Sequence, residues 1–206
     1  VRCRVGMVFQ YPEHQLFEET VLKDIAFGPG NMGLSPQEAE ERGRKAAAFV
    51  GLSEDFLSKS PFELSGGEKR RVAIAGVIAI DPDVLVLDEP TAGLDPMGRD
   101  VLLAQITSYH KTRGNTVLLV SHSMEDIART ADRILVMNSS HMAMFGPTKD
   151  VFARGAELEE MGLRVPQITK ILACLRERGW PVGTALTMEE AVRELLPLLE
   201  KGGVKE

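Results

Sequence analysis

Two short stretches in the middle of this chain combine residue types that can bind a phosphate group and activate water. The first is Leu-Ser-Gly-Gly-Glu at residues 64–68, in which Ser65 can cap a helix and Glu68 can return a hydrogen bond to the cap. Gly66 and Gly67 carry no side chain, so the N–H groups and the positive end of the helix dipole stay accessible to an anion. This stretch therefore predicts a helix start that binds phosphate.

The second stretch is an apolar run that ends in two carboxylates. Residues 84–87 (Val-Leu-Val-Leu) are typical of a buried parallel strand, and Asp88 and Glu89 follow at the usual ligand edge of an open α/β sheet. Asp88 is placed to hold Mg²⁺, directly or through water, and Glu89 is placed to polarise an attacking water. Each stretch alone also fits an ordinary helix start or a solvated loop, so the inference depends on their conjunction.

Strands and helices alternate in the part of the chain that must position these side chains. This alternation predicts an α/β fold with a parallel-dominated sheet covered by helices. Predicted strands are residues 5–9, 84–87, 116–120 and 133–137, the last continuing into a hairpin with 141–145, and predicted helices are 36–50, 65–80, 97–112 and 124–129. After Pro147 the pattern indicates helices only, at about 166–178 and 187–199.

In this order and spacing the residues resemble the ATP-binding cassette (ABC) family, whose nucleotide-binding domain has a P-loop NTPase-like fold. Residues 64–68 resemble its signature motif, 84–89 its Walker B strand and 92–95 its D-loop. Gln10, which follows the apolar run 5–9, resembles the glutamine of the Q-loop.

A fifth motif follows the predicted strand at 116–120, where Ser121 and His122 resemble the switch histidine region of the family. A histidine after a strand is more often a cap or a solvated residue, but this one is in the correct order with the other matches. The resemblance covers about residues 5–147.

The resemblance implies hydrolysis of ATP with Mg²⁺ across a dimer, in which the signature of one subunit closes over the nucleotide of the other. The implied site residues are Glu89 and His122 for catalysis, Asp88 and Gln10 for the metal, and Gln10, Ser65, Gly66, Gly67, Glu68, Asp88 and Asp95 for the nucleotide.

One motif of the family is not found in the sequence. A P-loop has the pattern G-x-x-x-x-G-K-[ST], and no lysine of this chain is preceded by glycine. In the family this loop lies well upstream of the Q-loop glutamine. We therefore expect an ABC ATPase domain that is incomplete at its N-terminus and is inactive by itself. Whether a shortened protein or a clipped reading frame is the cause cannot be read from the residues.

Composition narrows the class of protein further. A net charge of −6 argues against nucleic acid as a partner, because phosphate backbones require a basic surface. Cys3 and Cys174 are too few and too far apart to indicate a disulfide framework or a metal site. No apolar stretch is long enough to span a membrane, so we expect any association with a membrane to be peripheral.

Among ABC proteins the chain most resembles the ATP-binding subunits of energy-coupling factor transporters, which import vitamins, cobalt or nickel. The resemblance lies in residues 5–29, in 67–76 and in the helical tail. It implies a second ATPase subunit, identical or paralogous, a transmembrane coupling protein and a substrate-binding membrane subunit, and a location at the cytoplasmic face of the membrane. The candidates to face the coupling protein are Glu13, Gln15, Phe17, Glu18 and Glu19.

The domain organisation implied is a partial ATPase domain at residues 1–150, with a helical subdomain at about 15–80, and a helical domain at 151–206. The leucines near the C-terminus fit packing within that domain and a dimerisation surface equally well. The charged run Lys69, Arg70 and Arg71 is predicted to be a solvated helix face.

Two alternatives to a transport ATPase remain open at this point. The chain could be a non-catalytic piece that lends its signature motif to a partner, as the missing P-loop suggests. It could also belong to a cassette ATPase that acts on DNA or ribosomes, which the acidic balance and the transporter-like segment after Gln10 disfavour. The transported substrate cannot be read, because specificity in such systems lies on another subunit.

Overall fold

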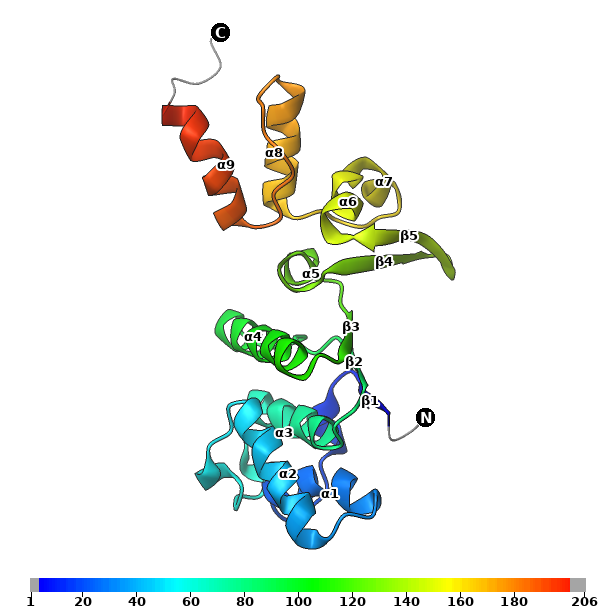
Figure 1. Cartoon of the computed structure of the whole chain (residues 1–206), viewed down its shortest axis with the longest axis vertical. Coiled ribbons are helices and arrows are strands. Elements are labelled where there is room, and N and C mark those ends of the chain that lie inside the picture. Colours follow the sequence, from blue (N-terminus) through cyan, green and yellow to red (C-terminus); the bar gives the residue numbers. More distant parts are fainter. Residues whose placement is uncertain (1–3, 201–206) are drawn as a thin grey trace. The chain divides into compact units, whose positions relative to one another are not determined.

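The computed structural model describes residues 4–200 and divides the chain into two compact units, one ending at Ser121 and the other beginning at His122 (Figure 1). The predicted domain boundary near residue 150 stays a prediction. Cys3 lies outside the described residues, and Cys174 is a free, exposed thiol. No helix in residues 4–200 is both long and apolar enough to cross a lipid bilayer.

The first unit is built on a parallel sheet. Strands β1 (Val5–Val8), β2 (Val84–Asp88) and β3 (Thr116–Val120) lie in the order β1-β2-β3 and are all parallel. The register pairs Val8 with Leu87, and Asp88 with Val120. The predicted parallel sheet is thus confirmed, and its middle strand is the one that carries the two carboxylates.

Helices separate the first two strands in sequence, as predicted. Helices α1, α2 and α3 gather beside the sheet in Figure 1, and α3 packs against α1, α2 and β1. Three short 3₁₀ turns join these elements, and α4 connects β2 to β3. The bounds are η1 (Pro12–Gln15), α1 (Val21–Asn31), α2 (Pro36–Phe49), η2 (Glu54–Phe56), η3 (Pro61–Glu63), α3 (Gly66–Ala79) and α4 (Pro96–Arg113).

The core of this unit holds β2 in place. Leu85 and Leu87 are fully buried, and they belong to the same apolar cluster as Ile74 of α3 and Leu102 of α4. Burying each such side chain contributes roughly 1.5–3 kcal/mol, so the strand that ends in Asp88 has little freedom to shift.

The second unit contains a hairpin and helices. Strands β4 (Arg133–Asn138) and β5 (His141–Pro147) pair antiparallel, as predicted, and Ser139 and Ser140 make the turn with positive φ angles. The helices are α5 (Met124–Thr130), α6 (Thr148–Ala153), α7 (Gly155–Glu160), α8 (Gln167–Glu177) and α9 (Met188–Glu200).

Helices α2 and α3 begin with the same capping arrangement. Ser65 donates its backbone N–H to Glu68 at 2.8 Å, its hydroxyl donates to the same carboxylate at 2.7 Å, and the Glu68 N–H donates back to the hydroxyl at 3.4 Å. Ser35 and Glu38 make the corresponding three bonds at 2.9, 2.7 and 3.4 Å. Both helix starts predicted from an S-x-x-E pattern are therefore confirmed.

Close packing between β1 and α3 requires glycine at position 6. A Cβ atom there would lie 2.6 Å from Val77 Cγ1 and 3.0 Å from Pro82 Cγ. We expect Gly6→Ala to lower the free energy of unfolding by about 1–3 kcal/mol, because the packed side chains must move apart. Urea unfolding of the 206-residue chain measures this change.

Gly30→Ala is the matched control for that substitution. A Cβ at Gly30 in α1 would meet no atom within 4 Å, so the same change in a helix should raise stability by about 0.5–1 kcal/mol. Equal effects of the two substitutions would contradict the packing argument.

The capping box of α3 makes stability depend on pH. Hydrogen bonds from the Ser65 side chain and backbone lower the pKa of Glu68 below its ordinary value. Because the unfolded chain has the higher pKa, about 4.3, the contribution of Glu68 is present above that pH and is lost as pH falls through the folded value. We expect Glu68→Ala to cost about 0.5–1 kcal/mol at pH 7 and progressively less below pH 4.

Urea unfolding of the parent and variant at both pH values measures the difference. Glu38→Ala should repeat the pattern, since Ser35 lowers the pKa of Glu38 in the same way. A cost of Glu68→Ala that stays constant between pH 7 and pH 3 would refute the capping explanation.

Candidate functional site

The carboxyl ends of the three parallel strands bring three of the predicted site residues to one edge of the sheet. Asp88 ends β2 and Glu89 follows it, while Gln10 stands two residues after the last residue of the neighbouring strand β1. In an open parallel sheet this edge is where ligands bind. Gln10, Asp88 and Glu89 thus lie at or just after the carboxyl ends of neighbouring strands, and their roles stay predictions.

The backbone at Glu89 adopts an uncommon conformation. Its φ angle is +48°, in the left-handed region that costs a non-glycine residue about 1 kcal/mol or more. Two hydrogen bonds hold it there: the Glu89 N–H donates to the Val120 carbonyl at 2.9 Å, and the Ala92 N–H donates to the Glu89 carbonyl at 3.1 Å. The surrounding structure thus fixes the direction in which this carboxylate leaves the strand.

The start of α3 is open toward an incoming group. The first-turn N–H groups of a helix have no partner inside the helix, and at this end only that of Glu68 is taken by the Ser65 cap. A Cβ at Gly66 would meet no atom within 4 Å, and one at Gly67 would touch only Leu94, at 3.6 Å. The bare backbone at Gly66 and Gly67 fits close approach by a phosphate.

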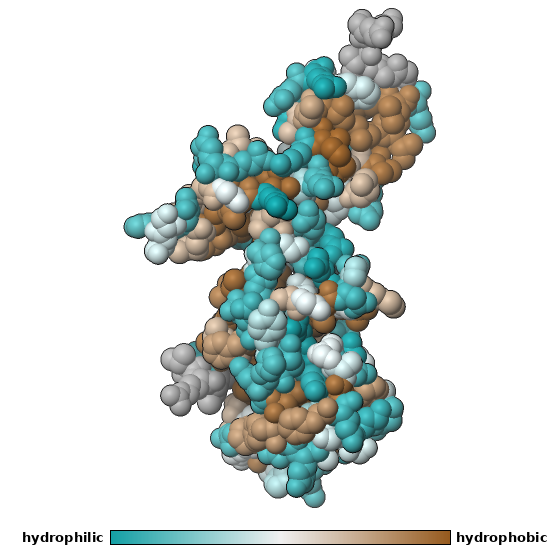
Figure 2. Space-filling model, turned by 180° about the vertical axis from the view of Figure 1, so that it is seen from behind, coloured by the Kyte–Doolittle hydropathy of each residue, from teal (hydrophilic) through white to brown (hydrophobic). Residues whose placement is uncertain are grey.

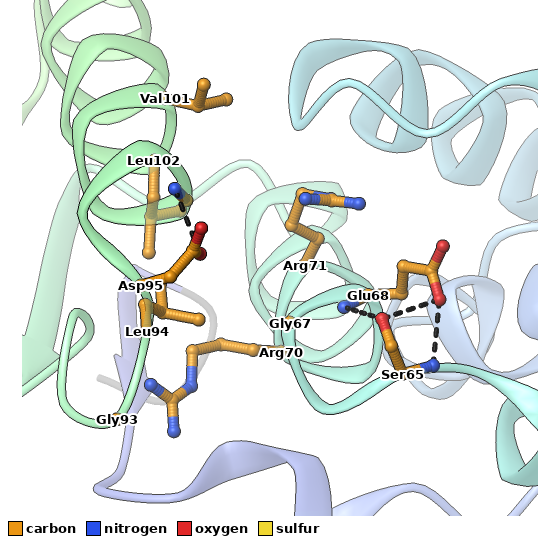
Figure 3. Close-up of a pocket in the computed structure, with 11 residues that line it drawn as sticks. Ser65, Gly67, Glu68, Arg70, Arg71, Gly93, Leu94, Asp95, Val101 and Leu102 are labelled. Carbon is orange, nitrogen blue, oxygen red and sulfur yellow. Dashed lines mark hydrogen bonds between the residues drawn. The ribbon is translucent and has the colours of Figure 1, made fainter.

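A cavity of about 300 Å³ lies between the start of α3 and the start of α4 (Figure 3). Asp95 bounds it on the α4 side, where its carboxylate caps the helix by accepting the Gly98 N–H at 3.2 Å. The lining residues are Ser65, Gly67, Glu68, Arg70, Arg71, Gly93, Leu94, Asp95, Gly98, Val101 and Leu102.

The predicted residues thus form two groups within the first unit. Ser65, Gly67, Glu68 and Asp95 line the cavity, whereas Gln10, Asp88 and Glu89 stand at the sheet edge and do not line it. Two groups are what the resemblance implies, since it assigns the signature residues to the nucleotide of another subunit. His122 begins the second unit, so its role stays a prediction.

The prediction that the run Lys69–Arg71 is a solvated face is wrong for Arg70. This side chain is buried, its guanidinium bonds to both carboxylate oxygens of Glu13, and it donates to the carbonyls of Pro90 and Ala92. A periodicity signal existed: Arg70 shares one helix face with Ile74 and Ile78, at intervals of four residues, and both are buried. Because Lys69 and Arg71 are also charged, the three residues together are typical of a solvated helix face.

A metal site made of protein groups alone is not present in residues 4–200, where no three His, Cys, Asp or Glu side chains cluster closely enough. Mg²⁺ in nucleotide sites is usually bound by one or two carboxylates together with phosphate oxygens and water. A single carboxylate such as that of Asp88, at the edge of the sheet, fits that chemistry.

Comparison with known proteins agrees with these motifs. The sequence model described as "ABC transporter" matches residues 1–92. The energy-coupling factor transporter ATP-binding protein EcfA2 of Caldanaerobacter subterraneus subsp. tengcongensis is 54% identical over 200 residues, which are 97% of this chain and 70% of that protein.

Two solved structures share the fold. The cbiO1 protein of Clostridium perfringens, described as part of the ABC transporter complex cbiONQ, is 37% identical with a TM-score of 0.69, over 84% of this chain and 68% of that one. The ATP-binding cassette MJ0796, in a dimer bound to ADP and Pi, is 25% identical with a TM-score of 0.61, over 70% of this chain and 63% of that one.

Motif order, sheet topology and these similarities agree, and the chain belongs to the family of ABC transporter ATPases, among the ATP-binding subunits of energy-coupling factor transporters.

Proposed function

We propose that this chain hydrolyses ATP to drive an importer of the energy-coupling factor type, for a vitamin or for cobalt or nickel. The observation that carries the proposal is the end of β2, where Asp88 and Glu89 stand at the ligand edge and the backbone of Glu89 is held in a left-handed conformation. A strained residue fixed by its neighbours is typical of a functional site.

In this proposal Glu89 accepts a proton from the water that attacks the terminal phosphate, and the bond to ADP breaks as the new P–O bond forms. Asp88 and Gln10 would hold Mg²⁺, which supplies positive charge to offset the negative charge of the phosphates, and the role that the family resemblance implies for His122 is contact with the terminal phosphate. Positioning and electrostatics supply most of the rate enhancement in such a reaction.

The start of α3 would act on the nucleotide of a second ATPase subunit. Gly66 and Gly67 offer backbone N–H groups, the Ser65 hydroxyl would turn from Glu68 toward the ligand, and the cavity beside them leaves room for a phosphate. The dimeric MJ0796 structure with ADP and Pi supports the pairing of two such subunits.

The last two helices would contribute to pairing of the subunits. Leu195 and Leu198 of α9 pack inside their own unit, whereas Val192, Leu196 and Leu199 are exposed and would be available to a second subunit. Figure 2 shows apolar residues gathered on one face of this region.

A membrane partner would bind the surface that follows Gln10. Phe17 and Phe27 are about half exposed and form an edge-to-face pair with ring centroids 4.8 Å apart. Exposed aromatic residues of this kind are enriched where proteins bind one another. Contact with a transmembrane coupling protein there would place the chain at the cytoplasmic face of the membrane.

The role of Glu89 can be tested by Glu89→Gln in a protein that carries a G-x-x-x-x-G-K-[ST] loop ahead of residue 1. Assembled with a second ATPase and the membrane subunits, the variant should hydrolyse ATP at least about 100-fold more slowly, because the amide cannot accept the proton from water. Phosphate release measures the rate.

Glu41→Gln is the control for this loss of charge. Glu41 lies on the surface of α2 and pairs with Lys45, so its replacement should leave the rate within about twofold. Hydrolysis by Glu89→Gln at the parental rate would exclude Glu89 as the base.

The two capping boxes separate a signature role from a structural one. Ser65→Ala and Ser35→Ala should each lower the free energy of unfolding by about 1 kcal/mol, since each removes the two hydrogen bonds of the serine hydroxyl and keeps the bond from the backbone N–H to the glutamate. Only Ser65→Ala should also slow ATP hydrolysis in the assembled dimer, by about tenfold or more, because it removes a hydroxyl from a charged phosphate. Equal rates for the two variants would contradict the proposed contact.

A further inference from the structure

We infer that Arg70 is a positioning residue that joins the segment after Gln10 to the loop after Glu89, so that displacement of one segment is transmitted to the other. Its consequence for transport rests on the proposed function, whereas the link itself is a property of the fold. Gln10 lies three residues before Glu13, and Glu89 lies directly before Pro90.

The guanidinium of Arg70 contacts both segments at once. On one side Nη2 and Nε donate to the two carboxylate oxygens of Glu13, in η1, at 2.9 and 3.2 Å. On the other side Nη1 donates to the carbonyls of Pro90, at 3.4 Å, and Ala92. Figure 3 shows Arg70 reaching from α3 toward the loop that contains Gly93.

Burial makes this arrangement specific. The Arg70 side chain is 4% exposed and that of Glu13 is 17% exposed, unlike the surface pairs such as Lys45–Glu41, in which both partners are mostly exposed. A bidentate pair with a fixed planar geometry, shielded from water, is stronger and more directional than a surface pair. Thr91, between the two bonded carbonyls, is itself buried.

The charge state of Glu13 fits a lasting ion pair. Burial is the largest influence on its pKa and raises it, but hydrogen bonds from Arg70 and from its own backbone, with the Arg70 charge, together lower it below the ordinary value. Glu13 therefore stays ionised at neutral pH. The Glu13 side chain points toward Arg70, so we infer that it does not itself contact the membrane partner. A displacement caused by a partner bound at Gln15 and Phe17 would instead reach Arg70 through Glu13.

The loop at residues 90–94 makes short-range backbone hydrogen bonds in addition to the two that it accepts from Arg70. The Leu94 N–H donates to the Thr91 carbonyl within the loop, and the Ala92 N–H donates to the carbonyl of Glu89, the residue directly before the loop. Arg70 supplies the charged anchor from outside the loop. Loss of that anchor should raise the frequency of local opening at residues 90–94 without unfolding the sheet.

Hydrogen–deuterium exchange of the 206-residue chain tests the link without nucleotide or partners. In Glu13→Gln, amides of residues 91–94 should exchange at least about tenfold faster than in the parent, although the substitution lies more than seventy positions away in sequence. Amides of α2 should keep the parental rate. Arg70→Lys, which keeps the charge but cannot reach all three partners, should act in the same direction.

Glu41→Gln is the matched control, because it removes the same charge from a surface ion pair and should leave residues 91–94 unchanged. Circular dichroism verifies folding, and if Arg70→Lys does not fold, Glu13→Gln decides alone. Unchanged exchange at residues 91–94 in Glu13→Gln overturns the inference. So does an equal acceleration in α2 and in the loop, because that result marks a purely structural role.

A second measurement separates this inference from the proposed function. In the assembled ATPase with a P-loop ahead of residue 1, Glu13→Gln should lower kcat about tenfold and leave KM for ATP within about twofold, since it displaces the loop beside Glu89 and not the bound nucleotide. A raised KM with unchanged kcat would overturn the positioning role. Absence of ATPase activity in the parent would reject the proposed function and leave the exchange result standing.

Discussion

Everything at the candidate site depends on the parallel register of β2 between β1 and β3. Because Val8 pairs with Leu87 and Asp88 with Val120, the strands end together and their following residues share one edge. A shift of one residue would send the side chains of β2 to the opposite faces of the sheet and would bury a carboxylate. The fully buried Leu85 and Leu87 make that shift costly, so apolar packing places the charged residues.

The two capping boxes show why local geometry alone does not identify function. Ser35–Glu38 and Ser65–Glu68 make the same hydrogen bonds at nearly the same distances, yet only the second has two glycines between the capping partners. In the second box the backbone beside Gly66 is open. The cap explains where each helix begins, and the absence of side chains explains which helix start a ligand can approach.

Much of this arrangement could be predicted from the sequence because it depends on local signals. The apolar run before Asp88, the S-x-x-E caps and the hairpin around Ser139 were each found within a residue or two of their observed bounds. The partners of Arg70 could not be predicted in the same way, because Glu13 and Ala92 are distant from it in sequence and meet it only when the sheet forms. The positive φ of Glu89 likewise depends on β3.

The burial of Arg70 is better explained by position than by stability. Removing a guanidinium and a carboxylate from water costs several kcal/mol for each ion, and an apolar replacement of similar volume often stabilises a protein equally well. Packing of α3 would therefore not by itself require a charge beside Ile74. What an apolar side chain cannot do is bond to Glu13 and to the Pro90 and Ala92 carbonyls together. Such bonds fix the relative placement of two segments that begin next to Gln10 and Glu89, and that placement is what a hydrolysis site at the edge of the sheet requires.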